Sequence, residues 1–168
     1  MGANSRWPLG FTCVVDPDPI DEPMLRSLKA YWDRKRGVRP MPRRADVDPL
    51  ELRPHLGNLV MIEALPDLDD YRYRLIGTNV AGRHGRDSTG KTVRELYEQA
   101  DPIVFDWSMA VLNATVANQR PVRATNRLRM VDRDYVASDQ LHLPLSEDGK
   151  SVNMILCEVL FVKLADRD

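Results

Sequence analysis

The sequence predicts an α+β fold, in which helices cover one face of a five-stranded antiparallel sheet and an N-terminal helix covers the other face. Two segments, 58–65 (NLVMIEAL) and 151–162 (SVNMILCEVLFV), are apolar at nearly every position, as is typical of central strands buried on both faces. A third, 101–119, repeats apolar residues at helical spacing, which predicts the main helix packed on the sheet. The 168 residues suit one domain of this kind.

The N-terminal part is predicted to supply the second covering layer. Residues 1–20 contain three prolines and no sustained apolar period, so we expect an arm there, of a composition compatible with disorder, rather than a helix or strand. A helix is predicted over 22–37, because Asp21 can cap it and Gly37 can end it. Its apolar face consists of Met24, Leu25, Leu28, Tyr31 and Trp32.

A basic linker follows, and Asp48 and Pro49 predict a short helix from there to about His55. The predicted strands are 58–65, 71–77, 121–131, 135–145 and 151–162. Short helices and turns are expected over 78–98. The chain therefore divides into an arm (1–20), a helical cap with its basic linker (21–56), a sheet-and-helix core (57–163) and a tail (164–168).

Composition excludes several classes of protein. The net charge of −1 argues against wholesale nucleic-acid binding. No apolar run approaches the roughly 18 residues that cross a bilayer, so no membrane insertion is expected. Cys13 and Cys157 are widely separated and no secretory leader precedes them, which predicts reduced thiols in a cytoplasmic protein.

The segment Gly85 to Thr92 (GRDSTGKT) matches the loop that cradles nucleotide phosphates, with Lys91 and Thr92 in the phosphate and magnesium positions. Such a loop must follow a buried strand directly, whereas GTNVAGRH precedes this one. Thr92 and Glu95 also form a capping-box pair, which favours a turn followed by a short helix. A small phosphate-loop nucleotide-binding enzyme is therefore the alternative hypothesis.

Three strings carry a resemblance to a known family: RPMPRRADVDP (39–49), YRYRLIGT (71–78) and GRDSTGK (85–91). With the order of predicted elements, they resemble PAS domains, and in particular a small stand-alone alphaproteobacterial PAS family formerly known only as a domain of unknown function. The similarity covers about residues 24 to 162. It implies the strand order 2-1-5-4-3, which makes the two central strands neighbours, as their hydrophobicity requires.

The resemblance implies a sensory or signalling domain that has no catalysis of its own. Such a domain binds a small molecule or a protein partner and acts on a separate signalling protein, here with a homodimer expected. The dimer contact would come from Leu28, Tyr31 and Trp32 of the N-terminal helix. A pure protein-interaction module with a closed core is the other reading that stays open.

Candidate ligand-binding residues are those expected to point between the sheet and the helices. They are Tyr73, Arg74, Trp107, Met130, His142 and Leu143. The same aromatic and methionine side chains also suit a closed core. For an anionic partner, the best candidates are Arg39, Arg43 and Arg44 in the basic linker, although such charge runs are usually solvated.

No particular cofactor is predicted. Haem would need an axial histidine in the helical region, where only His84 lies, among glycines and arginines typical of a solvated turn. Flavin photochemistry would need a reactive cysteine on the helical side, whereas Cys157 falls in the last strand and Cys13 in the arm. Haem, flavin and nucleotide are thus each not expected, and neither is a metal.

Overall fold

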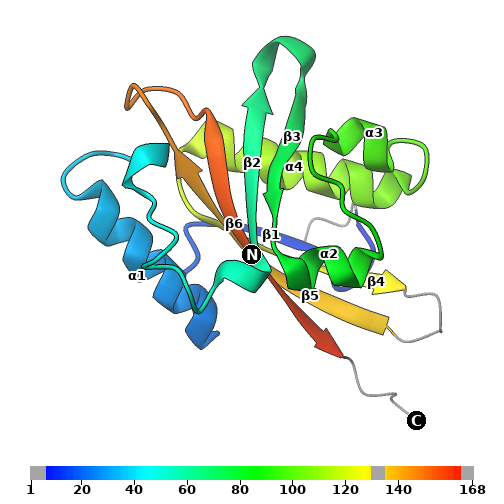
Figure 1. The fold of residues 1–168 in the computed structure, drawn as a ribbon. Coiled ribbons are helices and arrows are strands. Elements are labelled where there is room, and N and C mark those ends of the chain that lie inside the picture. The colour runs from blue at the N-terminus through cyan, green and yellow to red at the C-terminus, as the bar shows by residue number, and fades with distance from the viewer. Residues whose placement is uncertain (1–6, 130–134, 164–168) are drawn as a thin grey trace.

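Six antiparallel strands form a single sheet in the computed structural model, which describes residues 7–129 and 135–163 (Figure 1). The strands are β1 (Thr12–Val15), β2 (Leu59–Leu65), β3 (Asp70–Ile76), β4 (Val122–Arg129), β5 (Tyr135–Leu145) and β6 (Met154–Lys163). Across the sheet they follow the order β1-β4-β5-β6-β2-β3, and every neighbouring pair is antiparallel.

The five predicted strands correspond to β2 through β6 and lie in the predicted order 2-1-5-4-3. The two strands that are apolar on both faces, β2 and β6, are central neighbours, with Val60 opposite Cys157. Because successive side chains point to opposite faces, each of these strands supplies two separate layers of the core. The predicted fold class is therefore confirmed.

The sixth strand, β1, was not predicted. It lies within the segment expected to be an arm and adds to the edge of the sheet beside β4. Its four residues are mostly exposed, so they carry no apolar alternation that would reveal a strand. Contacts with α4 hold the segment instead: the Phe11 ring packs edge-on against Trp107 at 5.9 Å, and Trp107 Nε1 donates a 3.0 Å hydrogen bond to Thr12 O.

Three helices cover one face of the sheet: α2 (Thr78–His84), α3 (Val93–Tyr97) and the long α4 (Pro102–Asn118). Asp101 caps α4 as expected, since its Oδ1 accepts a 3.1 Å hydrogen bond from Val104 N. Gln119 ends the helix in the left-handed conformation, at a φ of 54°. In the described part of the chain, every helix is too short or too polar to span a membrane.

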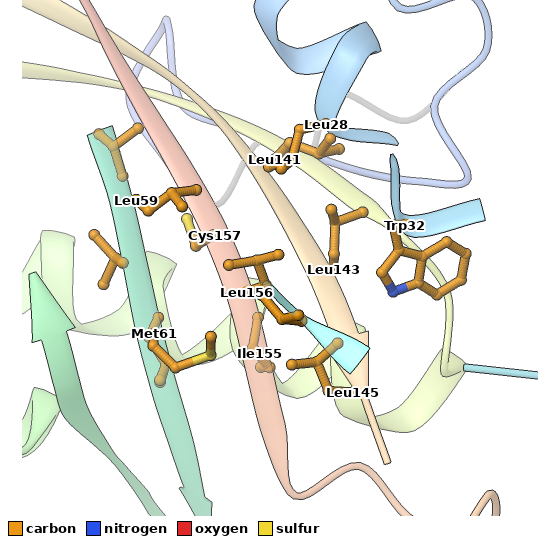
Figure 2. Packing of buried hydrophobic residues seen from close by; sticks show 14 of the residues in the cluster. Leu28, Trp32, Leu59, Met61, Leu141, Leu143, Leu145, Ile155, Leu156 and Cys157 are labelled. Carbon is orange, nitrogen blue, oxygen red and sulfur yellow. The ribbon is translucent and has the colours of Figure 1, made fainter. Parts of the chain in front are cut away.

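The helix α1 (Pro23–Arg36) covers the opposite face of the sheet (Figure 1). Glu22 rather than the predicted Asp21 caps it, because Glu22 Oε1 accepts a 3.1 Å hydrogen bond from Met24 N. Figure 2 shows Leu28 and Trp32 next to the leucines of β5. Trp32 Nε1 also donates a 2.8 Å hydrogen bond to Pro144 O, which fixes the helix to that strand.

This packing corrects the expected dimer contact. Leu28, Tyr31 and Trp32 are only 0%, 4% and 3% exposed, because they fill the core between α1 and the sheet of their own chain. A second chain could reach these side chains only if α1 left the sheet. The amphipathic pattern in the sequence marks a buried face, and it does not say which surface covers that face.

The segment between α1 and β2 is a series of turns and not the predicted short helix. Asp48 Oδ1 accepts a 2.9 Å hydrogen bond from Leu50 N, and the 3₁₀ helices η1 (Arg44–Asp46) and η2 (Leu56–Asn58) flank the turns. His55 ties this segment to the sheet, since its Nδ1 lies 3.0 and 2.9 Å from the two carboxylate oxygens of Glu158. The cap is therefore bound to the central strand β6.

Candidate functional site

A cavity of about 270 Å³ lies between the sheet and helices α2, α3 and α4. This volume is close to the lower end of the range for small-molecule sites, roughly 300–1,000 Å³. Much of its lining is apolar and comes from Ile62, Val80, Leu96, Val104, Val111 and Leu112. The aromatic rings of Tyr73, Tyr97, Trp107 and Phe161 also line it.

A strip of polar side chains follows β5 along the cavity face. Ser138, Gln140 and His142 alternate along the strand and so share one face of the sheet. His142 Nε2 lies 3.0 Å from Gln140 Oε1, and Gln140 Nε2 donates a 3.0 Å hydrogen bond to Ser138 Oγ. The Ser138 hydroxyl donates to Oδ1 of Asn126, its partner on β4. The four side chains thus form one chain of hydrogen bonds.

His142 stands at one end of this strip and is 4% exposed. Because the Gln140 amide oxygen can only accept, His142 Nε2 carries the hydrogen and Nδ1 is left as an acceptor. Nδ1 is buried without a hydrogen-bond partner among the described residues. Burial lowers the pKa of His142 to about 4, so the ring is neutral at neutral pH. The Cys157 sulfur lies 3.6 Å from the other ring nitrogen of His142, Nε2.

Positive charge gathers where α2 and the loop after it line the cavity. Arg83 and Arg86 are exposed there, and the Arg83 guanidinium lies 5.8 Å from the centre of the Phe161 ring. Desolvation and the neighbouring Arg86 lower the pKa of His84, which keeps this imidazole neutral at neutral pH. One carboxylate, Asp101, also lines the cavity, where it caps α4. The charged lining therefore carries two guanidinium groups against one carboxylate.

The structure separates the predicted ligand-binding residues into two groups. Tyr73, Trp107 and His142 line the cavity. The Arg74 side chain is 53% exposed and its Nε lies 3.4 Å from Glu63 Oε2, outside the cavity lining. Leu143 packs on the α1 side of the sheet, as Figure 2 shows. Met130 lies outside the described residues.

Sequence reasoning missed Asn126, Gln140, Arg83 and Arg86. The alternation of Ser138, Gln140 and His142 with the buried leucines of the same strand is a signal that could have found the polar strip. Asn126 joins it only through the strand register, in which Asn126 lies opposite Ser138. Arg83 and Arg86 could be placed only once the position of α2 over the sheet was known.

The GRDSTGKT string joins two short helices and does not leave a strand. Gly85 ends α2 at a φ of 69°, and Thr92 begins α3. The capping box is confirmed: Thr92 Oγ1 accepts from Glu95 N at 3.1 Å, while Thr92 N donates to Glu95 Oε2 at 2.8 Å. The hydroxyl that a phosphate loop would offer to magnesium therefore caps a five-residue helix.

The basic linker is largely occupied by contacts within the chain. Arg39 Nη2 lies 2.8 Å from Asp46 Oδ2 and 2.7 Å from Lys35 O. The backbone N–H of Arg43 donates to the same carboxylate, and Arg44 Nη1 lies 3.5 Å from Val47 O. These bonds hold the linker in its turn, so an anionic partner would have to compete with Asp46 for Arg39.

The positions of the cysteines and histidines bear on the cofactor expectations. Cys157 lines the cavity, although it does so from β6 and not from the helices. Cys13 lies in β1. His84 lies at the end of α2, with its ring centre 6.3 Å from that of Phe161. Within residues 7–129 and 135–163, no three His, Cys, Asp or Glu side chains gather in a way that could hold a metal ion.

The sheet order, the three helices on one face and the cavity between them agree with a family match. A family model described as "PAS domain" matches residues 20–159, most of the chain. The chain belongs to the PAS domain family. The predicted resemblance is thus confirmed at the level of the family and the fold.

Among solved structures, this PAS domain is similar to the one described as "Structure of an RNA-binding Light-Oxygen-Voltage Receptor", with a TM-score of 0.52 and 14% sequence identity. The match covers 89% of this chain and 38% of that chain, so the present chain spans little more than a third of that receptor's length. At this identity the likeness shows the fold alone. No curated protein matches the chain.

Proposed function

We propose that this PAS domain senses a small organic molecule bound in the cavity between the sheet and helices α2, α3 and α4. The observation that carries the proposal is a cavity of about 270 Å³ lined by a buried polar strip in which His142 Nδ1 lacks a partner among the described residues. Buried polar groups in a closed core are normally paired. A pure interaction module would be expected to fill this space with apolar side chains.

We propose that a signal passes from the cavity to the cap through β6, whose two faces carry the side chains involved. Cys157 lines the cavity, while the adjacent Glu158 points to the other face and holds His55 of the cap. A ligand that shifts β6 would therefore disturb the hydrogen bond between Glu158 and His55, which attaches the cap to the sheet. We propose that this change is recognised by a separate signalling protein, without catalysis by the PAS domain itself.

A cytoplasmic location and a homodimer belong to the same proposal. The buried face of α1 does not supply the dimer contact, so the contact surface would be one that is exposed in the single chain. A protein partner, rather than nucleic acid, fits the near-neutral net charge of −1.

Native mass spectrometry of the protein purified from its own host tests the proposal. We expect a retained small molecule in the wild type and its loss in Ser108→Phe, because Ser108 lines the cavity and a phenyl ring there would fill it. Ile103→Phe is the matched control, since Ile103 lies on the same helix and is 49% exposed. A wild-type protein that carries no molecule in any preparation, or a molecule that survives Ser108→Phe, contradicts the proposal.

A further inference from the structure

The polar strip and the charged rim of the cavity favour one chemical class of ligand. We infer that the cavity takes a small anion with an apolar body, such as an aromatic carboxylate, whose acid group lies between the Asn126 amide and Arg83. This inference rests on the proposed function, because it names the ligand of the same cavity.

The hydrogen-bond chain determines what Asn126 can offer. Ser138 donates to Asn126 Oδ1, because the Ser138 oxygen already accepts from Gln140. The amide oxygen of Asn126 is thus occupied, and the group left to a ligand is the Nδ2 amide, which only donates. Asn126 is 3% exposed and lines the cavity. A buried residue fixed as a donor favours a ligand that accepts.

The strand register places Asn126 at the same end of the cavity as the arginines. Asn126 lies opposite Ser138, and Ser138 lies opposite Phe161 on β6. Asn126 and Phe161 are thus two strand spacings apart, about 10 Å between backbones. Arg83 lies over the Phe161 ring. An acid group held at this end would meet an amide donor from one side and a guanidinium from the other.

The charges around this end agree with an anion. The ion pairs of the described residues include neither Arg83 nor Arg86, while Asp101 Oδ1 accepts a hydrogen bond from Val104 N at the start of α4. The pKa of His84 is lowered by partial desolvation and by the neighbouring Arg86, which disfavours a positive charge on this imidazole. Charge-assisted hydrogen bonds are about twice as strong as neutral ones, so a carboxylate gains more here than an amide would.

The body of the ligand would lie against the remaining lining. Trp107, Val111 and Leu112 of α4 line the cavity, as do Ile62 and Tyr73 of the sheet. These are apolar and aromatic surfaces that suit a single ring system, and the volume of about 270 Å³ limits the ligand to that size. We therefore expect one end of the ligand to be acidic and the part that meets α4 to be apolar.

Isothermal titration calorimetry with two matched probes tests the inference. The probes are 3-phenylpropionate and its neutral amide, 3-phenylpropionamide, which differ only at the acid end. Wild-type protein is expected to bind the acid about tenfold more tightly than the amide, because hydrogen bonds to a charged acceptor are about twice as strong as those to a neutral one. Equal affinity for the two probes would overturn the inference.

Asn126→Asp is the decisive variant, because it keeps an oxygen to accept from Ser138 and replaces the amide donor with a carboxylate. We expect it to abolish the preference for the acid, whereas Asn113→Asp, which adds the same charge on α4 outside the cavity lining, should retain it. Arg83→Gln tests the inference at an exposed site that does not endanger folding, and should reduce the preference about threefold. Arg74→Gln, outside the cavity, is its control.

The outcomes distinguish this inference from the proposed function. If the host-purified protein retains a neutral molecule, or if Asn126→Asp and Arg83→Gln both keep the preference for the acid, the ligand class is wrong while the sensory function stands. If neither probe binds and the protein retains no molecule, both the ligand class and the proposed function fail.

Discussion

The buried pair formed by His55 and Glu158 provides a stringent test of how the cap is attached to the sheet. Glu158 is 0% exposed and His55 is 4% exposed, and Nδ1 of the imidazole lies within 3.0 Å of both carboxylate oxygens. The substitution His55→Leu keeps a side chain of similar bulk and removes the partner of the carboxylate. Glu158 would then remain in the core without its donor.

The magnitude follows from this geometry. Removal of the only side-chain partner from a buried carboxyl group such as this one costs about 3–5 kcal/mol of unfolding free energy at the upper end, because the carboxyl group stays buried and unpaired. Replacement of both partners by apolar residues is often neutral, so the double variant with His55→Leu and Glu158→Leu should recover most of the loss. For a chain of this size each kcal/mol shifts Tm by about 2–4 °C, so His55→Leu should lower Tm by about 6–20 °C.

Urea unfolding followed by circular dichroism, at constant pH, measures the three variants against the wild type. The expected pattern is a large loss in each single variant and a smaller loss in the double variant, which is a coupling between the two positions. A loss below about 1 kcal/mol in His55→Leu, or a double variant with the sum of both single losses, would show that the pair does not hold the cap.

Three further predictions concern other parts of the chain. The free energy of unfolding should fall by about 3 kcal/mol as the pH falls from 6.5 to 4, because His142 takes up a proton near pH 6.5 when unfolded and near pH 4 when folded. A pH series of urea midpoints measures this loss, and His142→Phe should flatten the series between pH 6.5 and 4. A series that His142→Phe leaves unchanged would refute the prediction. Thr92→Ala should lower the free energy of unfolding by about 1 kcal/mol, because it removes the cap of α3, whereas Lys91→Ala should change it by no more than about 0.5 kcal/mol. If the wild type binds Mg-ATP and Lys91→Ala abolishes that binding, the phosphate-loop enzyme is favoured instead. Trp32→Phe should lose about 1–3 kcal/mol with its bond to Pro144 O, and wild-type stability in this variant would mean that the bond does not anchor α1.

Much of the fold could be predicted because local patterns and global packing agree. Apolar residues on both faces of 58–65 and 151–162 required two neighbouring central strands, and β2 and β6 are such a pair. Thr92 and Glu95, three positions apart, predicted the start of a helix, and they form the capping box of α3. Signals of this kind are complete within a short window of the chain, so tertiary contacts are not needed to recognise them.

The features that escaped prediction depend on contacts between distant residues. β1 is held by Thr12 pairing with Thr125 and by Phe11 against Trp107, partners about a hundred positions away. The burial of the α1 face against the sheet, rather than against a second chain, depends on where Pro144 lies. An amphipathic pattern indicates that one face of a helix is buried, but the sequence alone does not show which surface covers that face.

The candidate site shows the same limit. His142 could be selected from its position among the leucines of 141–145, but the pairing that fixes Asn126 as a donor exists only in the strand register. Arg74 was a candidate polar group for a ligand in the cavity, but its side chain lies beside Glu63 instead. Alternation identifies the two faces of a strand, and only the packed sheet shows which face meets the cavity.

An experimental structure of the protein purified from its own host would test the central claim most directly. The account predicts one small molecule in the cavity beneath α4, with an acceptor atom at about 2.7–3.2 Å from Asn126 Nδ2 and its apolar part against Trp107. A cavity that is collapsed, or that contains only ordered water between the sheet and helices α2, α3 and α4, would contradict the account.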